Sequence, residues 1–173
     1  MSIFCLNCRG LGDPRAVKNL RLVLRRFSPT LVFLSEAKRS VAEMKIVKQQ
    51  LGCYNGVSVD CRGHSGGLSL LWEKSTKVTL LSYSMHHIDI MVEGVGCPTP
   101  WRFTGIYGWY EISLKFKTCD MIRDLSRGST LSWIIGGDLN EILFHFEKKG
   151  GLVKARPFWT ISEKLLTIVD CLT

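Results

Sequence analysis

Long apolar runs and a leader pattern are both missing from this chain. No apolar run approaches the roughly 20 residues that a membrane-spanning helix needs. The first residues alternate like a strand, whereas a signal peptide begins with charge and continues with an apolar segment. We therefore expect an intracellular protein, in the nucleus or the cytoplasm, that is neither secreted nor inserted in a membrane.

Linkers, repeats and low-complexity segments are absent as well. The 173 residues are 46% apolar and 22% charged, which is ordinary usage for a globular protein. A chain of this length can bury a sizeable core. We expect residues 1–173 to form one domain.

Regular cysteine spacing is a third absence. Seven cysteines is an odd number, which fits free thiols in a reducing compartment. Cys5 and Cys8 form a CxxC pair, but the two side chains should face opposite sides of a strand or straddle the turn after it, and no second pair lies nearby. We do not predict a zinc or redox site from this pair.

Acidic residues are few relative to basic ones. The chain has 15 Asp and Glu against 23 Lys and Arg, which gives a net charge of +8. This excess fits an anionic partner and favours nucleic acid over a membrane or an acidic protein. It does not identify the nucleic acid, and it indicates no obligate protein partner.

Basic residues gather on two predicted helices. Asp13 can cap the first and Pro14 can start it. Its apolar stripe would be Val17, Leu20, Leu24 and Phe27, and its basic face Lys18, Arg21 and Arg25. Ser40 and Glu43 form a candidate capping box for the second helix, which carries Lys38, Arg39, Lys45 and Lys48 around it. Such faces are solvated helix surfaces more often than DNA-binding grooves.

Hydrophobic periodicity predicts an α/β protein with helices flanking β-sheets. We expect strands at 2–7, 31–35, 54–59, 67–73, 77–83, 87–93, 101–107 and 131–136, and helices at 14–27, 40–51, 111–127 and 158–169. The helix at 111–127 is supported by apolar residues at helical spacing, Ile112, Phe116, Cys119 and Ile122. The short strands in the middle of the chain look like a meander.

The stretch 134–141 contains the most informative motif. An apolar run typical of a buried strand ends in two glycines and delivers Asp138 and Asn140, two residues apart. A period of two places these side chains on one face, just past the strand end. A carboxylate and a carboxamide together can hold hydrated Mg²⁺, orient a water or protonate a leaving oxygen, which suits phosphodiester cleavage. The octapeptide alone is also typical of an ordinary strand-to-turn exit.

Further apolar strands carry a polar group or a glycine at one end. The strand at the start of the chain ends at Asn7, and the next one ends at Glu36. Two more, within 66–72 and 104–108, have glycines at one end. A rigid scaffold converges side chains on one site in this way.

These motifs resemble a known family. NCRGLG, LSEAK, GGLSLLW, TGIYG, IGGDLNEIL and the later EKKGG stand in the order found in the endonuclease/exonuclease/phosphatase superfamily. Within it they are most similar to the endonuclease domain of plant LINE-type (non-LTR) retrotransposons, from residue 3 to the last residue. The resemblance implies a DNase I-like four-layer α/β sandwich with its active site at one rim, and it implies that the domain is incomplete at the C-terminus.

The resemblance also implies roles for five residues. Glu36 resembles the metal-binding carboxylate, and Asn7 its neighbour that positions the metal or the scissile phosphate. Tyr107 resembles the tyrosine that contacts the phosphate, Asp138 the carboxylate that serves proton transfer, and Asn140 the residue that orients the water or phosphate oxygens. The implied cofactor is Mg²⁺ or Mn²⁺ and the implied substrate is DNA. Each residue also has a plain alternative as a strand-end polar group or a half-buried aromatic.

Several positions depart from the family pattern. Arg9 stands where repair-type relatives have an acidic metal partner, although the retrotransposon branch commonly has Arg there. Tyr110 stands where plant elements often have proline and repair enzymes an asparagine that contacts phosphate, and Cys119 stands at a position that is often Trp. These substitutions suggest drift.

The family's aspartate–histidine dyad has no counterpart in this sequence. In the family, a further Asp and a terminal Ser-Asp-His motif activate the water, and both follow the segment that resembles 158–173. None of the four histidines, His64, His86, His87 and His145, stands in such a motif. Two expectations follow, a DNA-nicking hydrolase encoded in truncated form and nearly inactive, or a non-catalytic remnant that folds partly or binds nucleic acid weakly.

Overall fold

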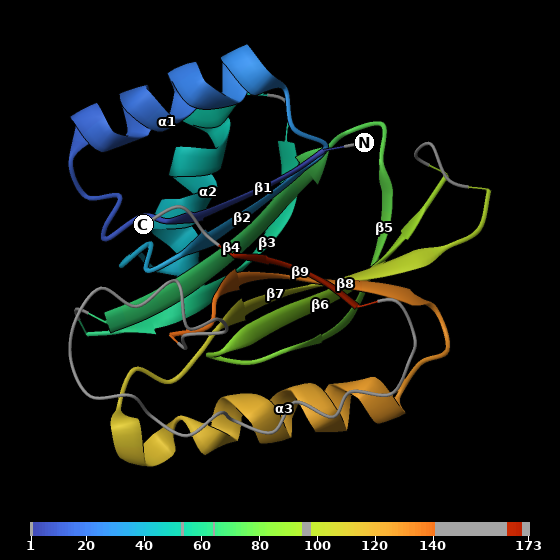
Figure 1. Ribbon diagram of the computed structural model, residues 1–173. Coiled ribbons are helices and arrows are strands. Elements are labelled where there is room, and N and C mark those ends of the chain that lie inside the picture. Colours follow the sequence, from blue (N-terminus) through green and yellow to red (C-terminus); the bar gives the residue numbers. More distant parts are fainter. Residues whose placement is uncertain (1, 53, 64, 95–97, 141–165, 171–173) are drawn as a thin grey trace.

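Two β-sheets pack face to face, and helices cover the outer face of each (Figure 1). The computed structural model describes residues 2–52, 54–63, 65–94, 98–140 and 166–170. One sheet has the order β1-β2-β4-β3 and carries α1 and α2. The other has the order β5-β6-β7-β8-β9 and carries α3. The predicted four-layer α/β sandwich is confirmed.

The elements follow the predicted order closely. The strands are β1 (Ile3–Asn7), β2 (Leu31–Ser35), β3 (Tyr54–Arg62), β4 (Ser65–Glu73), β5 (Lys77–Tyr83), β6 (His87–Glu93), β7 (Trp101–Tyr107), β8 (Ser132–Asp138) and β9 (Leu166–Asp170). The helices are α1 (Pro14–Phe27), α2 (Val41–Leu51), a 3₁₀ turn η1 (Ile112–Leu114) and α3 (Phe116–Arg127). Among the helices that the structure describes, none is long and apolar enough to cross a membrane.

Both predicted helix starts are confirmed. The Asp13 carboxylate accepts a hydrogen bond from the Arg15 backbone N–H at 2.8 Å, and Pro14 opens α1. Ser40 and Glu43 form the complete capping box of α2. These local signals succeed because a cap satisfies N–H groups that have no partner within the helix itself.

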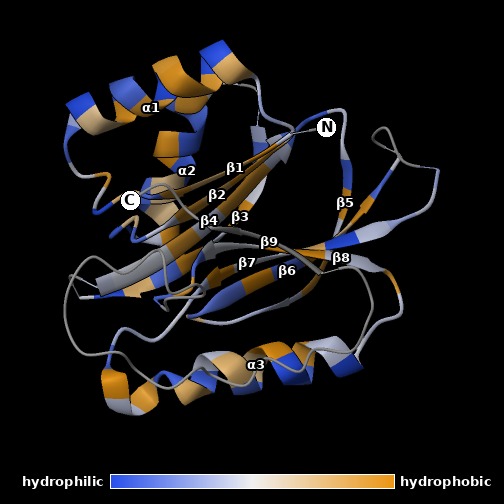
Figure 2. Cartoon of the chain, in the orientation of Figure 1, coloured by the Kyte–Doolittle hydropathy of each residue, from blue (hydrophilic) through white to orange (hydrophobic). Residues whose placement is uncertain are grey.

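The apolar stripe predicted for α1 is only partly right. Val17, Leu20 and Leu24 are buried against the first sheet, but Phe27 is 63% exposed. Phe27 is the last residue of the helix, and Ser28 leaves it in a left-handed conformation with φ 42°. The helix therefore ends before this ring reaches the sheet. Figure 2 shows the alternation of apolar and polar residues along α1.

The stripe predicted for 111–127 is wrong at its first two positions. Ile112 is 74% and Phe116 is 58% exposed, whereas Thr118 and Ile122 are buried. Ile122 packs against β7 and β8. The predicted single helix is divided into η1 and α3, and the change of helical pitch between them turns the early residues away from the sheet.

The helix predicted at 158–169 is contradicted where the structure describes it. Residues 158–165 lie outside the described residues, but Leu166–Asp170 form strand β9, parallel to β8. The run Leu-Thr-Ile-Val is rich in β-branched residues, which suit a strand. A short apolar run fits the helical period and the strand period equally, and here it forms a strand because it can pair with the free edge of β8.

Two parallel strand pairs bring the ends of their strands to one rim of the sandwich. β1 pairs with β2 so that Asn7 lies opposite Ser35, and β7 pairs with β8 so that Tyr107 lies opposite Asp138. The carboxyl ends of parallel strands meet at one edge of a sheet. Because the two sheets pack face to face through residues such as Phe33 and Phe103, both edges contribute to the same rim.

A buried ion pair lies on the other face of the second sheet, and the sequence patterns did not predict it. Arg102 on β7 and Asp89 on β6 are 3% and 1% exposed and form two hydrogen bonds of 2.8 Å. Thr104 donates to Asp89 at 2.7 Å and accepts from the Trp133 indole at 2.8 Å. Arg102 also donates to the Leu125 carbonyl at 2.7 Å, which ties α3 to the sheet.

Candidate active site

The five residues predicted from the sequence lie together at the rim. Asn7 ends β1, Glu36 directly follows β2, Tyr107 ends β7, Asp138 ends β8, and Asn140 stands two residues further on. Two of them come from the first sheet and three from the second. The site is therefore formed only when the sheets pack together.

The Asn7 amide joins the two carboxylates of the site. Its Nδ2 donates to Glu36 Oε1 at 3.0 Å and to Asp138 Oδ2 at 2.8 Å. The Tyr107 hydroxyl donates to the same Glu36 oxygen at 2.9 Å. Hydrogen bonds to charged groups are stronger than neutral ones and fix orientation. The side chains of Glu36 and Asp138 thus point into one site, although they belong to different sheets.

The backbone around the site is strained. Arg9, Glu36, Lys38 and Asn140 have φ angles of 49°, 50°, 51° and 52°, which are left-handed values in residues other than glycine. Such conformations persist where the surrounding structure requires them, and they cluster at functional sites. The Asn7 Oδ1 accepts from the Arg9 N–H at 3.1 Å and stabilises one of these turns.

Asn140 and Asp138 also show the turn-forming behaviour that we considered as the alternative. Asp138 Oδ1 accepts from the Asn140 N–H at 2.9 Å, and Asn140 Nδ2 donates to the Gly108 carbonyl at 2.8 Å. The Lys115 ammonium donates to the Asn140 carbonyl. These bonds hold the end of β8 beside the end of β7 and leave Asp138 Oδ2 directed to Asn7.

Burial and neighbouring carboxylates determine the protonation of Tyr107. Burial, the hydrogen bond to Glu36, and the charges of Glu36 and Asp138 raise the pKa of the Tyr107 phenol above its usual range. The phenol is therefore protonated at neutral pH and acts as a hydrogen-bond donor. The ammonium of Lys38 lies 3.9 Å from Glu36 Oε2 and forms an ion pair with that carboxylate.

The two cysteines of the CxxC pair pack on opposite faces of the first sheet. Cys5 packs in the core between the sheets, whereas Cys8 packs on the helix side of the first sheet, as the alternation predicted. Burial and the nearby Glu36 carboxylate raise the pKa of the Cys8 thiol to about 12. Cys8 is therefore a protonated thiol at neutral pH.

The donor set fits a hard divalent cation. Within the described ranges no group of three or more His, Cys, Asp or Glu side chains converges, so the rim offers two carboxylates and not a full cage of protein ligands. Two carboxylates linked through one amide provide oxygen ligands only, and Mg²⁺ is commonly held by one or two carboxylates while it keeps several waters. Glu36 is the residue that would hold it, with Asn7 beside it.

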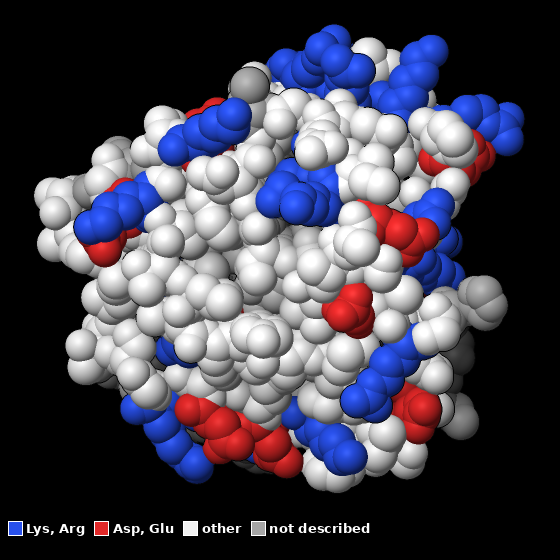
Figure 3. Space-filling model, turned by 180° about the vertical axis from the view of Figure 1, so that it is seen from behind, with Lys and Arg blue, Asp and Glu red and all other residues white. Residues whose placement is uncertain are grey.

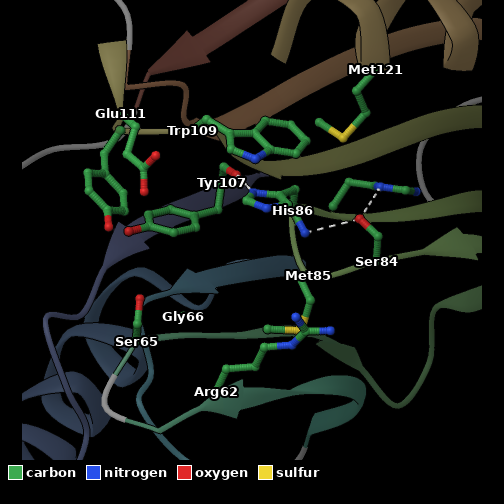
Figure 4. A pocket seen from close by; sticks show the side chains of 13 residues that line it. Arg62, Ser65, Gly66, Ser84, Met85, His86, Tyr107, Trp109, Glu111 and Met121 are labelled. Atoms are coloured by element: carbon green, nitrogen blue, oxygen red, sulfur yellow. Dashed lines mark hydrogen bonds between the residues drawn. The ribbon is translucent and has the colours of Figure 1, made fainter. Parts of the chain in front are cut away.

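A pocket adjoins the site on the far side of Tyr107 (Figure 4). Its volume is about 590 Å³. Its lining comes from the β3–β4 hairpin, the turn before β6, the segment after β7 and α3, and it includes Arg62, Met85, His86, Trp109 and Tyr110. Sequence reasoning missed this pocket. The available signals were the Trp109-Tyr110 pair after TGIYG and the adjacent histidines at the start of β6.

Solved structures with the same fold include several nucleases. An AP endonuclease from Archaeoglobus fulgidus has a TM-score of 0.68 at 13% identity and covers 87% of this chain and 62% of its own. TDP2 from D. rerio, complexed with a single-strand DNA product, has a TM-score of 0.60 at 16% identity, with 82% and 61% covered. The endonuclease domain of TRAS1, a telomere-specific non-LTR retrotransposon, has a TM-score of 0.61 at 9% identity, with 80% and 59% covered.

These likenesses establish the fold, and the chain spans about three fifths of the length of each structure. The search of curated proteins found no match. The family model for the Endonuclease/Exonuclease/phosphatase family matches residues 4–160, a range that contains every residue of the rim site. Because this match extends over most of the sequence, the chain belongs to the Endonuclease/Exonuclease/phosphatase family.

Proposed function

We propose that this chain is a metal-dependent phosphodiester hydrolase of the DNA-nicking type, related to the endonucleases of plant LINE retrotransposons. The observation that carries the proposal is the single Asn7 amide that holds Glu36 and Asp138 together across the two sheets. Two carboxylates and an amide at a strand-end rim suit the handling of a phosphate, a metal and a water.

Each rim residue has a part in this proposal. Glu36 would hold the cation, and Mg²⁺ or Mn²⁺ would supply Lewis-acid stabilisation of charge on the phosphate oxygens when bound. Tyr107, which stays protonated, donates a hydrogen bond at the phosphate end of the site. Asp138 handles the proton transfers of hydrolysis, and Asn140 with Asn7 keeps it in position.

DNA is the substrate that we propose. Two solved structures with the same fold support this substrate, TDP2 complexed with a single-strand DNA product and the endonuclease domain of TRAS1. The net charge of +8 supports it by electrostatics. Figure 3 shows Lys and Arg side chains gathered along the upper end of the molecule, where α1 lies, and mixed with acidic residues lower down. Lys18, Arg21 and Arg25 are exposed on that helix.

We also propose that the 173-residue chain hydrolyses DNA slowly. Both histidines in the described part of the chain are engaged elsewhere. His86 bonds to the Tyr107 carbonyl at 2.9 Å, and His87 bonds to Ser82 and Ser84. Neither described histidine forms a hydrogen bond with Glu36 or Asp138, and a site without a positioned general base loses about 10²–10⁴-fold in rate. The engagement of both described histidines in other hydrogen bonds supports the alternative function, a nucleic-acid-binding protein without catalysis.

The test is a plasmid-nicking assay in Mg²⁺ together with a binding titration of Mn²⁺. We expect Glu36→Gln to weaken Mn²⁺ binding by at least about tenfold. The matched control is Glu73→Gln, another partly buried carboxylate at a strand end but away from the rim. Unchanged metal affinity in Glu36→Gln would remove the metal site from the proposal.

The assay also separates the enzyme from the non-catalytic alternative. A polypeptide extended by a segment with Asp and Ser-Asp-His should nick supercoiled DNA at least about 10²-fold faster than the 173-residue chain. Asp138→Asn should abolish nicking, and Asp120→Asn, an exposed residue of α3, should not. If the 173-residue chain nicks within tenfold of the extended one, the proposed slow rate is wrong. If neither nicks, the non-catalytic function stands.

A further inference from the structure

We propose that the pocket beside the candidate active site binds one unpaired nucleobase, that of the nucleotide next to the scissile phosphate. This inference rests on the proposed function and specifies its substrate. It predicts that the protein prefers nucleic acid whose bases are free to leave the helix.

The pocket and the active site share Tyr107. The hydroxyl of this residue donates to Glu36 in the active site at 2.9 Å, and its carbonyl accepts from His86 Nδ1 at 2.9 Å on the pocket side. Figure 4 shows the Tyr107 ring between Trp109 and the hairpin residues Arg62 and Ser65. A nucleotide whose phosphate lies at Glu36 can therefore place its base in the pocket without crossing any other part of the protein surface.

One wall of the pocket is an ordered aromatic platform. The Trp109 indole stacks on the His86 ring with 3.6 Å between centroids and 18° between planes. Burial lowers the pKa of the His86 imidazole, so its ring is neutral at neutral pH. Met85 and Met121 contribute soft apolar surface nearby. A flat apolar wall that is already ordered binds a flat aromatic ligand at a low entropic cost.

The opposite side carries the positive charge. Arg62, at the end of β3, is exposed and forms no ion pair with any described residue. A guanidinium stacks on a base or contacts its phosphate equally well. Aromatic side chains combined with arginine along a groove are typical of sites for single-stranded nucleic acid.

The lining favours a base over a second phosphate. A phosphate needs several cations or convergent N–H donors, and the pocket offers Arg62 as its single Lys or Arg among the lining residues. Tyr110 lies at the mouth, is 64% exposed and makes no side-chain hydrogen bond among the described residues. A volume of about 590 Å³ is within the usual range of small-molecule sites and accommodates one base with its sugar.

The test compares two single-stranded oligonucleotides of equal length and charge, one with normal bases and one with abasic sugars throughout. Binding is measured by fluorescence anisotropy without divalent metal, so that no cleavage occurs. We expect the wild-type chain to bind the normal oligonucleotide roughly tenfold more tightly than the abasic one, since stacking of a base on an aromatic residue has an effect of this size.

Substitutions in the pocket test whether the preference for the oligonucleotide with normal bases arises there. Tyr110→Ala and Trp109→Ala should each reduce the preference severalfold and leave the affinity for the abasic oligonucleotide unchanged, while Trp109→Phe should keep most of it. The matched control is Tyr83→Ala, which removes a tyrosine of similar exposure, 60%, from β5 outside the pocket. Tyr110 is exposed, so its removal tests the pocket even if Trp109→Ala fails to fold.

The outcomes are distinct. Equal affinity of the wild-type chain for the two oligonucleotides would overturn this inference and leave the proposed function standing. A preference that Tyr110→Ala and Tyr83→Ala reduce equally would also overturn it. If the chain bound neither oligonucleotide, the inference and the proposed substrate would both be wrong.

Discussion

Gly105 lies where the two sheets pack against each other. It lies opposite Gly136 in the β7–β8 ladder, and the Phe33 ring of the other sheet occupies the space beside it. A Cβ on Gly105 would lie 2.2 Å from the Phe33 ring. Gly105, the first glycine of the TGIYG motif, is thus explained by packing as well as by its place near the site.

We predict that Gly105→Ala destabilises the fold by about 1–3 kcal/mol or more, because the new methyl group forces Phe33 out of position. Gly128→Ala is the control, since Gly128 has φ −86° and its nearest heavy atom would be 3.7 Å from a Cβ. The control should be neutral or slightly stabilising, by up to about 1 kcal/mol. Urea unfolding of both variants, and of Gly105→Ala with Phe33→Leu, measures the effect. Strict additivity in the double variant would contradict the proposed clash.

His86 and His87 make stability depend on pH. Burial is the main cause that lowers the pKa of each imidazole. For His86, the hydrogen bond to the Tyr107 carbonyl raises the pKa and Lys117 lowers it. For His87, the Asp89 carboxylate raises the pKa, and Arg102 and His86 lower it. As pH falls through the ordinary histidine range, the unfolded chain therefore binds more protons than the folded one.

We predict that the free energy of unfolding decreases as pH is lowered from about 7.5 to about 5.5. The sign follows because stability rises with pH wherever the unfolded state binds more protons. Replacing both residues in His86→Gln/His87→Gln should flatten the dependence between these pH values. Denaturant unfolding at the two pH values measures it. Stability that rises toward acid pH would show that the imidazoles are stabilised in their charged form.

Helix α3 is held by the sheet beneath it more than by its own residues. Its start has no side-chain cap, and its last turn receives a hydrogen bond from Arg102 through the Leu125 carbonyl. The Arg102 guanidinium also lies 4.5 Å from the centre of the Trp133 ring. The Asp89–Arg102 pair therefore positions the element that also provides Met121 to the pocket.

We predict that Arg102→Met destabilises the protein by about 3–5 kcal/mol, because it leaves the buried Asp89 carboxylate without its partner. Arg127→Met, which breaks an ion pair between groups that are 76% and 72% exposed, should cost at most about 1 kcal/mol. The double variant Asp89→Val/Arg102→Met should lose less than the sum of the two single variants. Thermal and denaturant unfolding provide the comparison. An Arg102→Met variant as stable as the control would refute this account of α3.

At the scale of the whole molecule, charge governs the proposed association with DNA. We predict that the affinity for duplex DNA falls steeply with salt, with log K decreasing by about 0.9 per log unit of salt for each phosphate neutralised. Replacing Lys18, Arg21 and Arg25 by Gln should reduce this slope by about one for each contact that is lost.

The control for that triple variant removes the same charge elsewhere. Lys77, Arg123 and Arg127 are each paired with a carboxylate, and their replacement by Gln should change the slope less. Anisotropy titrations over a range of salt concentrations measure both variants. Equal slopes in the two triple variants would show that net charge, and not the α1 face, determines binding.

The sequence by itself determined most of the elements and the polar residues at their ends, although it predicted a helix where β9 lies and one helix where η1 and α3 lie. Asp13, Ser40 and Glu43 predicted helix starts because a cap is satisfied within a few residues of chain. Asn7 and Asp138 were recognisable because each ends an apolar run beside a glycine turn. These signals are local, so they do not depend on what the element packs against.

Only the tertiary structure decided which of these residues meet and which faces are buried. Asn7 and Asp138 are 131 positions apart, and their hydrogen bond exists because two separate sheets pack face to face. The exposure of Phe27 and Phe116 depends on where a helix begins or ends over its sheet, and the spacing of apolar residues in the sequence does not show this. The pocket, too, is formed by segments far apart in the chain, so its lining follows from the packing of the layers and not from any one motif.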